Sequence, residues 1–257
     1  MRLETEVRIG SEEPVTGGFK LGTPDVGISV ENLAMEVMGF DLVEFDHAEG
    51  AVRPSPDWSG DARPAESVVL PDRDPVLAAL LAEAGAHILT QDNGSAPVLV
   101  ALWGEDCSAY CARTGTDHRR LFALDPAGAL AARVTLMAPP GSDAALRDRL
   151  AARLATVRKV TCIADCAGFI GQRIAAMVAN LGCEMAQTAL ATPADIDTAM
   201  ALGLNYPVGP LALADRFGLP RLLAVMQGLQ ALTGDDRYRP SQWLRRRGQL
   251  GLSARKG

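Results

Sequence analysis

Glycine and proline interrupt a helical region of this chain at one place. Between Gly203 and Pro210 the sequence reads GLNYPVGP, with two prolines and two glycines, and apolar periodicity resumes immediately afterwards. Proline lacks a backbone donor, forces the residue before it toward an extended conformation and suits the first turn of a new helix. The stretch therefore predicts a sharp corner between helices, after which residues 211–218 and 219–232 fold back on earlier helices.

The residues before this corner have helical periodicity as well. Residues 166–190 have the pattern of one long helix, and Thr192-Pro193-Ala194-Asp195 begins the next one. Threonine can cap a helix, proline fits its first turn, and an aspartate there complements the helix dipole. The C-terminal part of the chain is therefore predicted to be all-helical.

A different pattern precedes the helical part. Residues 74–85 and 141–157 read as helices, and residues 96–103, 119–125, 132–139 and 158–165 as short buried strands. Strands that alternate with helices over about ninety residues predict a small α/β unit with a partly parallel sheet. The segment looks too short for a complete two-halved dinucleotide domain, which needs six strands. The predicted fold is an α/β remnant of a nucleotide-binding fold followed by an all-α domain.

The first 66 residues are predicted to be an arm and linker, because glycine and proline break their apolar content repeatedly. Their glycine-rich segment, residues 17–27, has neither the phosphate-loop pattern nor G-x-G-x-x-G, and it is predicted to form turns. The expected organisation is an arm at 1–66, a degenerate α/β domain at 67–165 and a helical domain at 166–257.

Charge and hydropathy exclude two classes of partner. The net charge is −6, whereas a general nucleic-acid surface needs a basic field, so no nucleic acid is expected. No apolar run approaches the roughly 20 residues of a membrane span, and the N-terminus lacks the apolar core of a signal peptide. We expect a cytoplasmic protein that does not enter a membrane.

Cysteine and histidine give no metal site. The five cysteines are an odd number, and their C-x-x-x-C spacings differ from the C-x-x-C pairs usual for zinc. Cys162 lies in an apolar run, where a thiol usually behaves as a small buried hydrophobe. His47, His87 and His118 are interpreted as ordinary surface or core histidines. No metal is predicted.

Three segments carry a resemblance to a known family. Asp165-Cys166-Ala167-Gly168-Phe169-Ile170, PADIDTAMALGLNYPVGPLALAD and GDDRYRPSQWLRRR occur in this order over the last hundred residues. Together they resemble the C-terminal helical domain of 3-hydroxyacyl-CoA dehydrogenases. The likeness is strongest to the second, degenerate half of double-length enzymes of phenylacetate and hydroxybutyryl-CoA metabolism.

The resemblance implies an activity and names the positions that would carry it. The family oxidises the 3-hydroxyl group of an acyl-CoA with NAD as cofactor, and a histidine held by a glutamate acts as the base. The family's L-H-F-F-N-P segment corresponds to Leu121–Pro126, which puts Phe122 at the histidine, and the glutamate corresponds to Val134 or Thr135. The family's asparagine in G-F-I-V-N-R corresponds to Gln172, the candidate catalytic residue.

Candidate substrate residues are arginines. Arg173 follows Gln172, and Arg237 and Arg239 belong to a basic cluster that could bind the phosphates of coenzyme A or form a solvated helix face. Two hypotheses follow. In one, the protein is a family member that handles an acyl-CoA substrate, with missing groups supplied by other residues or by a partner chain. In the other, it is a non-catalytic module that forms a homodimer or pairs with a catalytic dehydrogenase.

Overall fold

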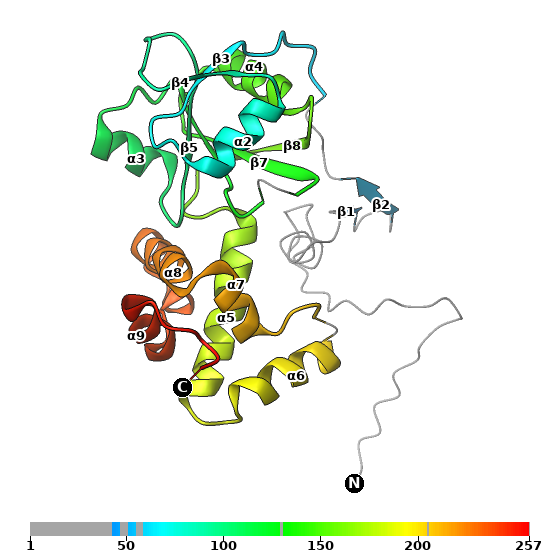
Figure 1. The fold of residues 1–257 in the computed structure, drawn as a ribbon, viewed down its shortest axis with the longest axis vertical. Helices are drawn as coiled ribbons and strands as arrows, with labels where there is room; N and C mark the ends of the chain where they lie inside the picture. Colours follow the sequence, from blue (N-terminus) through cyan, green and yellow to red (C-terminus); the bar gives the residue numbers. More distant parts are fainter. Residues whose placement is uncertain (1–42, 47–50, 55–58, 129–130, 205, 257) are drawn as a thin grey trace.

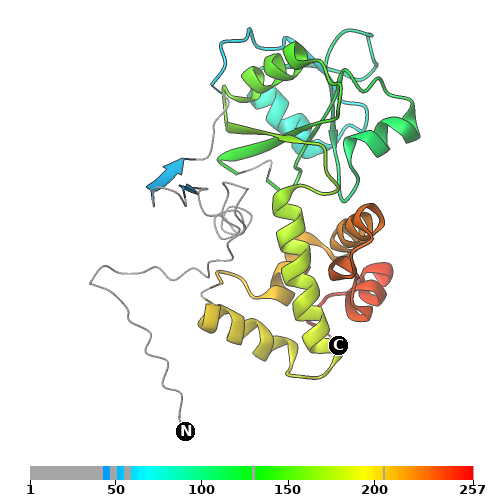
Figure 2. The same cartoon turned by 180° about the vertical axis from the view of Figure 1, so that it is seen from behind.

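The computed structural model describes residues 43–46, 51–54, 59–128, 131–204 and 206–256. It has two parts, a sheet domain and a helical domain, joined by the helix α5, Ile170–Gln187 (Figure 1). Figure 2 shows the same arrangement from behind, with α5 running from the sheet domain into the helical domain. Among the described residues, no helix is long and apolar enough to cross a membrane. His47 lies outside the described residues.

The strands and helices follow the predicted order. The strands are β1 Val43–Asp46, β2 Ala51–Pro54, β3 Ser67–Val69, β4 His87–Leu89, β5 Val98–Ala101, β6 Leu121–Leu124, β7 Arg133–Ala138 and β8 Lys159–Ala164. The helices of the sheet domain are α2 Pro75–Glu83, α3 Cys107–Thr114 and α4 Ala144–Leu154. Those of the helical domain, besides α5, are α6 Pro193–Leu204, α7 Pro210–Phe217, α8 Leu219–Thr233, the 3-10 helix η1 Asp236–Tyr238 and α9 Gln242–Leu250.

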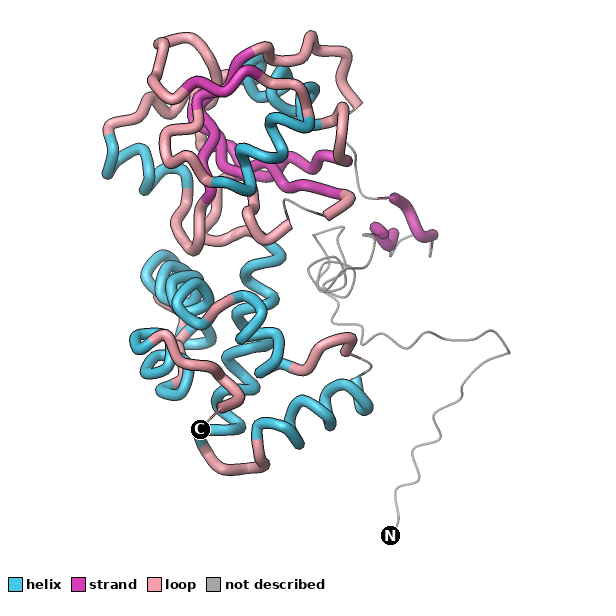
Figure 3. Tube along the Cα trace, in the orientation of Figure 1, coloured by secondary structure: helices cyan, strands magenta, loops and turns pink. Residues whose placement is uncertain are grey.

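The main sheet has six strands in the order β4-β3-β5-β6-β7-β8, and every pairing is parallel except β6 with β7. The sheet therefore has two strands more than the four that the sequence pattern indicated. Two strands, β3 and β4, have only three residues each, and the antiparallel β6–β7 pair needs no long crossover. The partly parallel sheet is confirmed. Figure 3 shows the main sheet with helices beside it in one half of the molecule, and helices and loops in the other half.

Cys162 and His87 both lie on strands of the main sheet. Cys162 is exposed, not buried, and lies on β8, the edge strand of the sheet. His87 begins β4 and does not end a helix, because the αL glycine Gly85 stops α2 two residues earlier. His87 and His118 are both exposed at the surface of the sheet domain.

The long helix α5 starts four residues later than its apolar pattern indicates. Gly168 has φ +67°, and Phe169 is extended and completely buried, so the chain turns between the end of β8 and the first turn of α5. An added Cβ at Gly168 would also meet the Val225 side chain at 3.2 Å. The left-handed backbone and the close approach both favour glycine.

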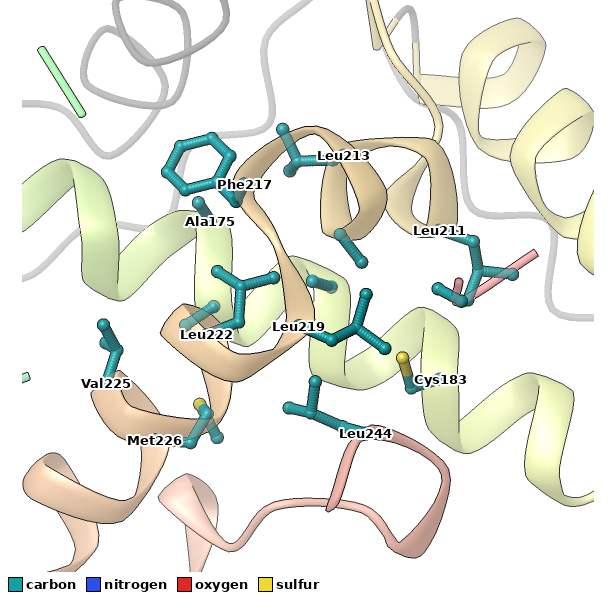
Figure 4. Close-up of a cluster of buried hydrophobic side chains, with 14 of the residues drawn as sticks. Ala175, Cys183, Leu211, Leu213, Phe217, Leu219, Leu222, Val225, Met226 and Leu244 are labelled. Atoms are coloured by element: carbon teal, nitrogen blue, oxygen red, sulfur yellow. The ribbon is translucent and has the colours of Figure 1, made fainter. Parts of the chain in front are cut away.

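The predicted corner is confirmed, and close contacts at Gly209 in the corner and at Gly182 of α5 accompany it. An added Cβ at Gly182 of α5 would lie 2.7 Å from the Cβ of Pro210, so the start of α7 packs directly on α5. A Cβ at Gly209 would collide with Asp197 of α6. Close backbone approach at both sites lets α7 and α8 fold back on α5, and Figure 4 shows their leucines meeting Ala175 and Cys183 of α5.

Asp197 caps α7 from a neighbouring helix. Its carboxylate accepts hydrogen bonds from Leu211 N at 2.7 Å and Ala212 N at 3.1 Å, and Arg255 Nε lies 3.2 Å away. The cap residue of α7, Gly209, has no side chain that could make these bonds. Asp197 is only 9% exposed, so its loss would leave backbone donors unpaired in the interior.

We therefore expect Asp197→Ala to lower the free energy of unfolding by about 2 kcal/mol. The matched control is Asp195→Ala on the same helix, where the exposed carboxylate accepts a hydrogen bond from Thr192 Oγ1 at 2.6 Å. That variant should lose about 1 kcal/mol or less. Urea unfolding followed by circular dichroism measures both, and equal losses would contradict the role given to Asp197.

The two domains meet backbone to backbone at one point. Gly104, in the loop after β5, lies against α8, where an added Cβ would be 2.6 Å from Val225 Cα. On the other side, a Cβ at Gly228 would fall on the Gly104 carbonyl group, 2.8 Å from its carbon. The neighbouring Trp103 ring makes an edge contact with Phe217 and lies under the Arg221 guanidinium at 4.9 Å. This loop therefore fixes the helical domain on the sheet domain.

Candidate functional site

A buried polar contact joins the ends of two strands to the start of α5. Gln172, in the first turn of α5, donates from Nε2 to Asp125 Oδ1 at 2.9 Å and to the Leu102 carbonyl oxygen at 2.9 Å. Gln172 has no exposed surface, and Asp125 is 5% exposed. Leu102 follows β5 and Asp125 follows β6, so the contact lies at the carboxyl ends of adjacent strands. The candidate catalytic residue is thus placed at the junction of the two domains.

Asp125 is a buried carboxyl group whose hydrogen bonds come from an amide side chain and from backbone nitrogens, all of them uncharged. Burial raises its pKa to about 6 from an ordinary 3.8, although hydrogen bonds from Gln172 and from the backbone at Ala127 and Gly128 act in the opposite direction. The Ala127 nitrogen lies 2.9 Å from Asp125 Oδ1. Gln172 Oε1 is buried and has no hydrogen-bond partner. The family motif indicated Gln172 but not Asp125, because the segment Leu121–Pro126 was compared only with the family's histidine segment.

The positions that correspond to the family's base and glutamate hold no acid–base group. Phe122 is completely buried among the apolar side chains of the sheet domain, and Val134 is buried in the same cluster. Thr135 is half-buried on β7. At Phe122, which the resemblance assigns to the family's histidine, a phenyl ring cannot take up a proton.

The candidate substrate arginines lie at two separate places. Arg173 is half-buried beside the domain junction, and its Nε donates to the Ala167 carbonyl oxygen at 3.2 Å. Arg237 pairs with Asp235 at 2.7 Å, and the Arg239 carbonyl oxygen accepts a bond from Asn180. Asn180 follows Arg173 by seven residues, which is two helical turns or about 10 Å along α5. Both groups therefore flank the same side of α5 without touching.

The rest of the basic cluster lies on α9. Arg245 and Arg246 are exposed, and the Arg247 guanidinium stacks on Trp243 with its carbon 3.8 Å from the ring centre. The stacking is a cation–π contact that fixes α9 locally. This geometry fits the solvated helix face better than a phosphate site.

Three thiols surround Met137 inside the sheet domain. Cys107 Sγ approaches the Met137 carbonyl oxygen at 3.9 Å, Cys166 Sγ approaches Met137 Sδ at 3.7 Å, and Cys111 packs in the same cluster. Burial raises the pKa of all three thiols, so they stay protonated and unreactive at neutral pH. In the described part of the chain, no group of histidine, cysteine and acidic side chains is arranged to hold a metal ion.

Comparison with known proteins identifies the helical domain. Residues 168–257 match the family model of the 3-hydroxyacyl-CoA dehydrogenase C-terminal domain. A probable 3-hydroxybutyryl-CoA dehydrogenase of Deinococcus radiodurans is 45% identical over 92 residues, which is 36% of this chain and 33% of that protein. The 3-hydroxyadipyl-CoA dehydrogenase of Escherichia coli K12 is 43% identical over 93 residues, 36% of this chain and 20% of that protein. The chain therefore spans a third or less of these relatives.

Solved structures extend the likeness to the sheet domain. A 3-hydroxybutyryl-CoA dehydrogenase from Escherichia coli K12 superposes with a TM-score of 0.53 and 34% identity over 60% of this chain and 32% of that chain. The (S)-3-hydroxybutyryl-CoA dehydrogenase of Ralstonia eutropha superposes with a TM-score of 0.54 over 86% of this chain and 89% of that chain, and at 21% identity it shows the fold alone. The α/β remnant of a nucleotide-binding fold followed by an all-helical domain is confirmed. The helical domain, residues 168–257, is therefore similar to the C-terminal domain of 3-hydroxyacyl-CoA dehydrogenases.

Proposed function

We propose that the protein acts in the oxidation of 3-hydroxyacyl-CoA substrates, as a chain that handles the acyl-CoA while a partner dehydrogenase chain supplies the base and NAD. The observation that carries the proposal is the match of residues 168–257 to the family's C-terminal domain, in a chain that has Phe122 buried where a base is needed. The amide of Gln172 and the guanidinium of Arg173 begin this domain at its junction with the sheet.

Arg173 is the best candidate for binding the acyl-CoA. Its side chain is half-buried at the start of α5, where the helix dipole adds partial positive charge, and no side chain caps this helix. A guanidinium in this position suits a carbonyl or phosphate oxygen of the substrate. Gln172 is held by Asp125 and Leu102, so its role is to position the first turn of α5.

The proposal predicts binding without turnover by the chain alone. Titration of the purified protein with acetoacetyl-CoA should give saturable heat, and NADH absorbance at 340 nm should not fall when both compounds are present. Arg173→Ala should weaken acetoacetyl-CoA binding about tenfold, the effect of losing one charge-assisted hydrogen bond. Arg149→Ala, at an exposed position on α4, is the matched control and should leave binding unchanged. Oxidation of NADH by the chain alone would overturn the division of labour.

A second candidate function is a non-catalytic association module, either in a homodimer or with a catalytic dehydrogenase. Several large apolar side chains of the helical domain are exposed, which favours a surface that meets another chain. They are Met177, Leu181, Leu190, Leu202, Leu204, Leu232, Leu250 and Leu252. Absence of acetoacetyl-CoA binding, together with a concentration-dependent dimer in sedimentation, would favour this function over the first.

A further inference from the structure

The sheet keeps the strand arrangement at which nucleotide-binding folds hold their cofactor. Strand β3 has β4 on one side and β5 on the other, and the chain leaves the carboxyl end of β3 through α2 toward β4. The strand order therefore reverses at β3, because successive strands of the chain lie on opposite sides of it. In open α/β sheets, dinucleotides bind at such a point, outside the carboxyl ends of the strands, with the pyrophosphate on a helix N-terminus. The helices that follow the carboxyl ends of β3 and β5 are α2 and α3.

The first of these helix N-termini is already occupied by a side chain. Asp74 Oδ1 accepts hydrogen bonds from Val76 N at 2.9 Å and Leu77 N at 3.0 Å. Pro75, the first residue of α2, has no backbone donor. The backbone donors that a pyrophosphate would use are therefore either missing or bound to a carboxylate.

The second helix N-terminus is closed as well. Asp165, which follows β8, accepts bonds from Cys107 N at 2.7 Å, Ser108 N at 2.9 Å and Ser108 Oγ at 2.5 Å. Asp106 accepts a bond from Ala109 N at 2.6 Å. All three of the first donors of α3 are thus satisfied by carboxylates from this chain.

The negative charge at this edge also disfavours binding of a dinucleotide, because its phosphates are negative. Tyr110 of α3 donates to Asp72 Oδ2 at 3.4 Å, which links the segment after β3 to α3. Glu105 is neutralised by Arg113 through bonds of 3.0 and 2.9 Å, but among the described residues no arginine or lysine forms an ion pair with Asp74 or Asp165. Phosphate groups placed beside them would be repelled.

From these contacts we propose that Asp74 and Asp165 occupy the places of the cofactor's phosphates, so that the sheet domain is complete without a dinucleotide and binds none. The residues of this chain do not fit NAD. The proposal deepens the proposed function, because a chain closed in this way needs a hydride acceptor held by another chain.

Direct binding measurements test the proposal. Titration with NAD or NADH up to 1 mM should give no saturable heat, and the midpoint of thermal unfolding should move by less than about 1 °C, since a ligand that binds the native state raises the midpoint. Stoichiometric binding, or a rise of several degrees, would overturn the proposal. The acetoacetyl-CoA titration is independent of this result, so failure of one proposal is distinguishable from failure of the other.

A pair of variants tests the carboxylates themselves. Asp165→Ala frees the nitrogens of Cys107 and Ser108, and inorganic phosphate at 50 mM should raise its unfolding midpoint by about 2–4 °C more than that of the unaltered protein. Asp165→Asn keeps one acceptor oxygen and should gain no more from phosphate than the unaltered protein. If phosphate raised the unfolding midpoint of all three proteins equally, the backbone donors of α3 would be free in the native chain, and the assignment would be overturned.

Discussion

Gly228→Ala, which adds a single methyl group at the contact between the two domains, should strongly destabilise the protein. The added Cβ would meet the carbonyl group of Gly104, 2.8 Å from its carbon, and Gly104 is itself held against Ala224 and Val225 of α8. Both partners are backbone, so neither can rotate away, and the helix must move off the loop. We expect a loss of about 3 kcal/mol in the free energy of unfolding, measured by urea denaturation.

A glycine in open space is the matched control for this substitution. Gly203 lies on α6 with no atom within 4 Å of an added Cβ, so Gly203→Ala should raise stability by about 0.5–1 kcal/mol through helix propensity. A loss of similar size in both variants would show that the Gly104–Gly228 contact does not fix the domains. Because the contact joins the sheet to α8, Gly228→Ala should also expose Trp103 and shift its fluorescence to longer wavelength.

The helical domain was predictable because its signals are local. Thr192 and Asp195 form the expected cap of α6, and Gly209 and Pro210 begin α7 at the expected corner. Such signals depend on residues a few positions apart. In the sheet domain β3 and β4 have three residues each, too few for alternation to stand out, and α3 has little apolar character.

The candidate site was predictable only in part, because its contacts are distant in sequence. Gln172 could be found from its motif, but its partner Asp125 is 47 positions earlier. Asp165 reaches the start of α3 across 58 positions, and no pattern near either residue indicates the pairing. These contacts depend on which strands lie side by side, and the order of strands is a property of the whole sheet.

The second large effect concerns the buried carboxyl of Asp125 and appears as a dependence of stability on pH. The folded state raises its pKa to about 6 from 3.8, so the native protein holds the proton more tightly than the unfolded chain. Protonation therefore favours the native state, and this contribution is complete below about pH 4 and lost as the pH rises through about 6. Across that window this contribution to the free energy of unfolding falls by about 3 kcal/mol.

Asp125→Asn should remove this dependence, because the amide cannot ionise and keeps an oxygen that accepts from Gln172 Nε2 and Ala127 N. Urea unfolding at intervals between pH 4 and 7.5 should show the unaltered protein losing stability relative to Asp125→Asn, with the variant more stable above pH 6. Asp92→Asn is a contrasting control. Arg120 holds the pKa of Asp92 at about 2, so Asp92→Asn should be less stable than the unaltered protein by a constant amount between pH 4 and 7.5, and this difference should shrink only below about pH 4. Parallel curves for Asp125→Asn and the unaltered protein would mean that water reaches Asp125 and that the junction of the two domains is open to solvent.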